Sequence, residues 1–247
     1  MGTKNDMSIS DHVEEVRKRI IYILISFVFF FIISFWLVDI LLSWVKSSAV
    51  AKNITWNVFS PGDSLNIYLK AMFFMAITFT IPIAIYHLLA FLKPGMTREE
   101  TVASFRYIPF SIFLLILGFL FSYFILFPSL INFTTIMNEK MEFEQTYGAL
   151  QYYKFLFNTV IPVTILFQFP LVMLLLTSVG VVNPQKLAKS RRAAYFILIV
   201  ISVIISPPDF ISDFLVFIPL VLLFEVSVIL SSWIYKRKPN LSVERSV

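Results

Sequence analysis

The 247-residue chain has no cysteine, only two histidines and few charged residues. The absence of cysteine excludes disulfides, thiolate metal sites and a cysteine nucleophile. His12 and His87 are too few for a histidine-rich metal site, so we predict neither a metal nor a cofactor. Charged residues make up 14% of the chain and hydrophobic residues 58%, whereas a soluble globular protein has about 25% charged residues. These proportions predict an integral membrane protein.

Apolar runs recur along the chain at lengths near the roughly 20 residues that a bilayer-crossing helix needs. They predict six spans, at residues 20–38, 71–92, 107–127, 155–182, 193–206 and 214–235. The first run is followed by no small-residue cleavage site, so we expect it to remain in the mature chain. No linker or low-complexity stretch divides the sequence. Residues 1–247 are therefore predicted to form a single all-α, six-helix transmembrane domain.

The lysines and arginines predict how the chain is oriented in the membrane. Fifteen of the 20 basic residues precede span 1, follow span 6, or lie between spans 2 and 3 or spans 4 and 5. Basic residues accumulate in cytoplasmic loops, so both termini are predicted to be cytoplasmic. The net charge of +5 then reflects this orientation, and we predict no nucleic-acid partner.

Prolines inside the apolar runs predict kinked helices, because each removes a backbone hydrogen bond. Such helices can enclose a concave bundle, in which the fifth and sixth helices are predicted to be short. The fifth run has 14 residues, which extend about 21 Å in a helix, against a hydrocarbon core of roughly 30 Å. Pro207 and Pro208 then end that helix. We therefore expect local thinning of the bilayer, or water entry on the outer side, along that edge of the protein.

Three polar residues in or beside the apolar runs are candidates for function. An ionisable residue inside a membrane is a functional candidate by default, and Glu225 is the charged residue well inside a span. It can either pair with a basic residue or stay protonated. Gln168 lies near the middle of span 4, where it can contact a partner helix or form an interhelical hydrogen bond within the chain. Asp209 follows the two prolines and requires water or a strong partner.

The residues before span 1 have the pattern of a helix that begins outside the membrane. Asp11 and Glu14 have capping character, and His12, Glu15 and Arg19 share one helical face. This face can form a binding site. Alternatively, Glu15 and Arg19 form a surface pair one turn apart, which stabilises a helix by a few tenths of a kcal/mol.

Several short segments, in order and at matching places relative to the spans, resemble the TatC family. The family contains the signal-peptide receptor subunit of the twin-arginine protein translocase. The segments are HVEEVRKR at 12–19, AFLKPG at 90–95 followed by Glu99 and Glu100, FP at 127–128, FQFP at 167–170, SPPD at 206–209 and LFE at 223–225. Many family members have glutamate where this chain has Gln168. A mechanism that needs a titratable group at that position therefore does not transfer.

The resemblance implies a site for the paired arginines of a signal peptide. The two carboxylates that receive them in the family fall on Glu15 and Glu100, and carboxylates suit the bidentate hydrogen bonds of guanidinium groups. Glu99 is the alternative to Glu100, since neighbours on a helix point about 100° apart. Phe91 and Pro94 would shape the loop. His12, Arg17 and Arg19 complete the predicted site, with both arginines pointing away or pairing with other acids.

The function implied by the resemblance is that of a receptor rather than an enzyme. The chain would bind twin-arginine signal peptides of folded proteins and recruit single-span TatA- and TatB-type subunits. Export would use the proton-motive force. We expect a bacterial-type cytoplasmic membrane location, contacts with further copies of the chain and contacts with membrane lipids. The alternative is a secondary transporter of a small solute, although no inverted repeat of the kind common in that class is evident. An intramembrane hydrolase would need a nucleophile–base pair, and we find none in the sequence.

Overall fold

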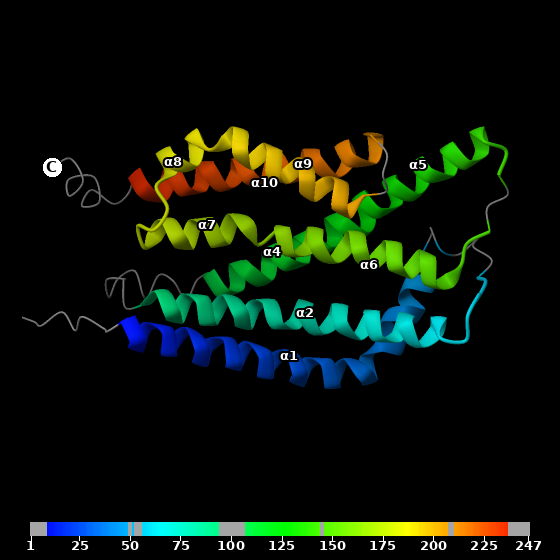
Figure 1. Ribbon diagram of the computed structural model, residues 1–247, viewed down its shortest axis with the longest axis horizontal. Coiled ribbons are helices and arrows are strands. Elements are labelled where there is room, and N and C mark those ends of the chain that lie inside the picture. Colours follow the sequence, from blue (N-terminus) through cyan, green and yellow to red (C-terminus); the bar gives the residue numbers. More distant parts are fainter. Residues whose placement is uncertain are drawn as a thin grey trace, which may run out of the picture.

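The computed structural model describes residues 9–48, 51, 56–93, 107–143, 146–206 and 210–236, with the backbone alone for residues 9–12. This part of the chain is helical almost throughout and contains no strand, which confirms the predicted all-α class (Figure 1). The helices are α1 (Ile9–Lys46), α2 (Asp63–Leu92), α4 (Tyr107–Phe121), α5 (Phe127–Lys140), α6 (Ala149–Leu166), α7 (Phe169–Ser178), α8 (Pro184–Lys189), α9 (Arg191–Ile205) and α10 (Phe210–Lys236), with a π-helical turn, η2 (Ser122–Leu126), between α4 and α5.

The helices overlap the predicted spans, but several are longer: α1 has 38 residues where the predicted span has 19, and α2 has 30 where it has 22. Among the described residues, five segments are long and apolar enough to cross a membrane: α1, α2, α4 to α5, α6 to α7, and α10. The fifth predicted span is α9, whose 15 residues extend about 22 Å. The prediction of a short sixth helix is wrong, because α10 has 27 residues. It begins at Phe210 and includes Asp213. The Asp213 carboxylate accepts a hydrogen bond from the Ser206 hydroxyl, which gives this polar side chain a partner within the chain.

Figure 1 shows α1 at one edge of the molecule and α8, α9 and α10 at the opposite edge, with α2, α4, α6 and α7 between them. α1 packs mainly on α2, α2 packs on α6 and α4, and α7 packs on α10, which also contacts α8 and α9. The start of α1 and the ends of α2, α7 and α10 lie at one end of the bundle, together with α8 (Figure 1). We call this the basic end, because α8 and the neighbouring helix ends carry most of the described lysines and arginines.

Two of the long segments are interrupted, and a proline follows each interruption. In the first, the amide of Phe127 donates to the carbonyl of Ser122 across a π-helical turn just before Pro128. In the second, α6 ends at Leu166 and α7 begins at Phe169, with Pro170 in its first turn. A proline has no amide hydrogen to donate, and the first turn of a helix tolerates this. Each proline therefore lies where a new helical turn begins.

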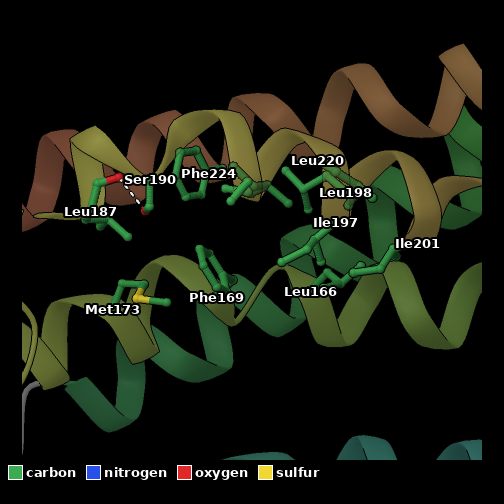
Figure 2. Close-up of a pocket in the computed structure, with 13 residues that line it drawn as sticks. Leu166, Phe169, Met173, Leu187, Ser190, Ile197, Leu198, Ile201, Leu220 and Phe224 are labelled. Carbon is green, nitrogen blue, oxygen red and sulfur yellow. Dashed lines mark hydrogen bonds between the residues drawn. The ribbon is translucent and has the colours of Figure 1, made fainter.

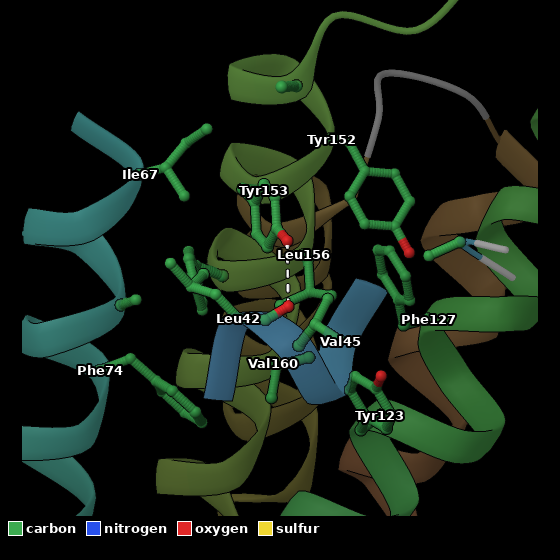
Figure 3. Close-up of a cluster of buried hydrophobic side chains, with 14 of the residues drawn as sticks. Leu42, Val45, Ile67, Phe74, Tyr123, Phe127, Tyr152, Tyr153, Leu156 and Val160 are labelled. Carbon is green, nitrogen blue, oxygen red and sulfur yellow. Dashed lines mark hydrogen bonds between the residues drawn. The ribbon is translucent and has the colours of Figure 1, made fainter. Parts of the chain in front are cut away.

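The largest buried cluster lies toward the end opposite the basic end and joins α1, α2, α5 and α6 (Figure 3). The Tyr153 hydroxyl donates to the Leu42 carbonyl over 3.4 Å, and Trp44 stacks on Tyr123 with ring centroids 4.5 Å apart. Two of the connections at this end, α1 to α2 and α5 to α6, also meet, because the amide of Ala149 donates to the carbonyl of Asn57 over 2.8 Å. This cluster fixes one end of the bundle and leaves α1 exposed along most of its length.

Candidate functional site

Glu15 lies on α1 near its start and is paired with Arg19 one turn later. The Arg19 Nε donates to Glu15 Oε1 over 3.2 Å, and Nη2 donates to the same oxygen. Both side chains are mostly buried, with exposed fractions of 23% for Glu15 and 21% for Arg19. The pair therefore differs from a freely solvated surface pair, because its environment keeps both groups in one geometry.

Arg19 also joins α1 to the end of α2. Its Nη2 donates to the Ala90 carbonyl over 2.8 Å, and a cation beside carbonyls of the last helical turns is favoured by the helix dipole. One turn further along α1, Tyr22 stacks on His87 of α2 with ring centroids 5.7 Å apart. The structure thus places the Glu15–Arg19 pair beside Ala90, the first residue of the AFLKPG segment.

The remaining residues of the predicted arginine site fall into two groups. Phe91 is half-buried and packs against the apolar cluster of α2, α4 and α7, whereas Arg17 is exposed on α1. Pro94, Glu99, Glu100 and the side chain of His12 lie outside the described residues, as does Asp209. The structure therefore pairs Glu15 with Arg19 and joins Arg19 to Ala90, whereas the neighbouring Phe91 side chain packs against the apolar cluster. The role of the other residues stays a prediction.

Gln168 is buried between α6 and α7 and is bonded to α4. Its Nε2 donates to the Ser111 carbonyl, and its Oε1 accepts from the Ser111 hydroxyl, both over 3.1 Å. Only 4% of the residue is exposed. The amide therefore satisfies its hydrogen bonds within the chain, by the interhelical bonding that the sequence offered as one interpretation.

Glu225 is paired with a basic residue, which was one of its two predicted states. Arg191 Nε donates to Oε1 over 2.8 Å, Arg191 Nη2 donates to Oε2 over 3.0 Å, and the Tyr195 hydroxyl donates to Oε1 over 2.6 Å. The hydrogen bond to Glu225 raises the pKa of Arg191 above its ordinary value, so this guanidinium stays charged. The Glu225 carboxylate therefore connects the start of α9 to the middle of α10.

Three partner groups were not identified from the sequence: the Ala90 carbonyl, Ser111, and the Arg191–Tyr195 pair. Ser111 precedes Gln168 by 57 residues, and Arg191 precedes Glu225 by 34. The spacing of apolar residues does not show which residues of two helices lie side by side when the helices are this far apart in the sequence. A backbone carbonyl has no sequence signal at all. The cluster of lysines and arginines around the start of α9 indicated that Glu225 can have a basic partner, but not which residue it is.

Comparison with known proteins gives concordant matches. The family model described as Sec-independent protein translocase protein (TatC) matches residues 11–219. The translocase protein TatCd of Bacillus subtilis strain 168 is 40% identical over 235 residues, covering 95% of this chain and 96% of the relative. TatCy of the same organism is 37% identical over 238 residues, covering 96% of this chain and 94% of the relative.

Solved structures agree with the sequence matches. A crystal structure of the twin arginine translocase receptor TatC superposes with a TM-score of 0.77 at 28% identity, covering 90% of this chain and 99% of the other. A second, of the same receptor in DDM, superposes with a TM-score of 0.80 at 28% identity, covering 89% and 99%.

Proposed function

The chain belongs to the TatC family, and on that premise we propose that it is the receptor and core subunit of a twin-arginine translocation system. It is a multi-pass membrane protein and a protein-transport component rather than an enzyme. In the proposed function it binds the twin-arginine signal peptide of a folded protein at the cytoplasmic face. It then recruits single-span TatA- and TatB-type subunits, and export uses the proton-motive force.

The observation that supports signal-peptide binding is the position of the Glu15 carboxylate. It lies at the junction of α1 and the end of α2, in a partly buried setting. Both Arg19 donors use Oε1, and within the described part of the chain no hydrogen bond reaches Oε2. A carboxylate has about four acceptor positions. Oε2 can therefore receive a guanidinium of a signal peptide while Arg19 keeps the carboxylate in place.

The proposed topology places the basic end in the cytoplasm of a bacterial-type cell. The lysine and arginine distribution supports this orientation, and it puts Glu15 and the Ala90–Phe91 segment on the side from which a folded substrate arrives. Assembly with further copies of the chain belongs to the same proposal. The solute-transporter alternative is not supported by the family, whose members are protein translocase components.

Replacing Glu15 with glutamine tests this function. We expect Glu15→Gln to weaken binding of a fluorescent twin-arginine peptide to the protein in nanodiscs by about 10- to 100-fold, because a hydrogen bond to a charged group contributes roughly 1.5–3 kcal/mol. Glu14→Gln is the matched control, since Glu14 pairs with Lys18 on an exposed surface of the same helix. Glu100→Gln should resemble Glu15→Gln. Unchanged binding in both Glu15→Gln and Glu100→Gln would contradict the proposal.

A further inference from the structure

A groove of about 330 Å³ runs along α9, between that helix and α6, α7 and α10. Figure 2 shows Leu198 and Ile201 of α9 facing Leu166 and Phe169 across it. Of the 13 residues drawn around the groove, Ser190 alone has a polar side chain, and its hydroxyl donates to the Leu187 carbonyl. The lining therefore suits a hydrocarbon and offers no hydrogen bond to a polar occupant along its length.

The groove has the length of one leaflet rather than of a whole bilayer. Its lining extends along α9 from Ser190 to Ile201, about 17 Å at 1.5 Å per residue, whereas half of the hydrocarbon core is about 15 Å. A helix roughly 10 Å across would fill about 1,300 Å³ over the same distance, more than the empty space of about 840 Å³ in the groove, part of which is open to its surroundings. Ile197 lines the groove and is 56% exposed, so the groove is open at its side. These dimensions fit an acyl chain better than a partner helix.

One end of the groove lies beside a cluster of positive charge. Leu187 and Ser190 line that end, and α8 with the first turn of α9 carries Lys186, Lys189, Arg191 and Arg192. Arg191 is paired with Glu225. The other three side chains are exposed and form no ion pair within the described residues. Basic residues at the membrane surface next to an intramembrane groove attract anionic lipid headgroups.

We propose that this groove is a binding site for an anionic phospholipid of the leaflet at the basic end. One acyl chain lies between α9 and the α6–α7 wall, and the phosphate lies near Lys186 and Lys189. The site does not involve Glu15 or the end of α2. It therefore goes beyond the proposed signal-peptide function and can be tested separately from it.

The test uses phosphatidylglycerol with a photoreactive diazirine in its acyl chain, at low mole fraction in phosphatidylcholine vesicles that contain the full chain. After illumination, mass spectrometry locates the labelled residues. We expect labelling of Met173, Ile197 and Ile201. Lys186→Gln with Lys189→Gln should raise the half-saturating mole fraction of probe about 25-fold, or about fivefold per lysine. Ala194→Phe, which places a ring in the groove, should abolish labelling of Met173.

Controls separate this site from ordinary lipid contact. Ile199→Phe adds a ring to an exposed position of α9 outside the groove lining and should leave labelling unchanged. The lysine variants alter exposed side chains, so they keep the test decisive even if Ala194→Phe does not fold. Equal labelling by a phosphatidylcholine probe, or no effect of the lysine pair, would overturn the proposal. A photo-crosslinker placed at Ile197 should capture lipid, and capture of a polypeptide instead would also overturn the proposal.

Discussion

Gln168 shows how a single side chain can fix two helices in a membrane. The Gln168 Nε2 donates to the Ser111 carbonyl, and the Gln168 Oε1 accepts from the Ser111 hydroxyl. A buried polar group is costly without such partners. The amide is therefore matched to this particular position on α4.

We predict that Gln168→Glu destabilises the protein by about 1–3 kcal/mol, the cost of leaving a buried polar group without its partner. An ionised carboxylate would place an oxygen against the Ser111 carbonyl, where Gln168 has a donor. Thermal unfolding followed by tryptophan fluorescence measures the change. Gln185→Glu makes the same chemical change at an exposed position on α8 and should unfold like the unmodified protein. Equal stability of the two variants would contradict this role of Gln168.

At the residue scale, the sequence indicated which polar residues matter, but mostly not which residues contact them. The interpretation of Glu15 as one member of a helical pair is correct, because Arg19 donates to its carboxylate. Ser111 and Arg191 could not be assigned as partners from the sequence. Their contacts depend on the rotation and height of one helix against another, which side-chain packing determines.

Gly118 allows α4 and α6 to approach closely at the level of whole elements. A Cβ at this position would lie 2.7 Å from Phe167 Cβ and 3.2 Å from Thr164 Cα. Neither atom is the end of a flexible side chain, so the helices would have to separate. Small residues serve this purpose at many helix contacts in membranes.

We expect Gly118→Ala to destabilise the protein by about 1–3 kcal/mol, as overpacking of a buried contact usually does. Gly62→Ala is a suitable control, because the nearest atom to a Cβ there is 3.9 Å away. The thermal unfolding midpoints of both variants give the comparison. A midpoint of Gly118→Ala no lower than that of Gly62→Ala would show that the contact can relax.

The link between α9 and α10 depends on the bidentate Arg191–Glu225 pair. We predict that Arg191→Ala and Glu225→Ala each lower the unfolding temperature, and that the double variant loses less than the sum of the two, because they remove the same interaction. The adjacent Arg192→Ala should have little effect, since Arg192 is exposed and forms no ion pair among the described residues. Strict additivity of Arg191→Ala and Glu225→Ala would contradict the coupling.

The positions of the helices could be predicted from apolar runs, but their ends and interruptions could not. α1 extends eight residues beyond the predicted span at its C-terminal end, to Lys46, because a helix can continue past the apolar run. The segment from α6 to α7 was predicted as one span, whereas its helical ladder breaks before Phe169. Pro170 predicted a kink there. Whether a proline bends a helix or ends it depends on neighbours that are distant in the sequence.

On the scale of the whole molecule, helices of very different length share one bilayer. α1 has 38 residues and extends about 57 Å, whereas α9 has 15 and extends about 22 Å. α9 ends at Ile205, and the hydroxyl of the next residue, Ser206, donates to Asp213 near the start of α10. The length of α9 is therefore about 8 Å less than the roughly 30 Å thickness of an undeformed hydrocarbon core. The polar groups of Ser206 and Asp213 lie at the end of this short helix.

We predict that the bilayer is thinner beside α9 than beside α1, by up to about 8 Å, because lipid deforms more readily than polar groups enter hydrocarbon. An electron cryomicroscopy map of the protein in a lipid nanodisc measures the distance between the two headgroup layers at each edge. The α1 edge is the internal control, since its helix exceeds the membrane thickness. A uniform thickness around the protein, with lipid chains covering Ser206, would show that partner subunits or a tilt of the bundle compensate for the short helix instead.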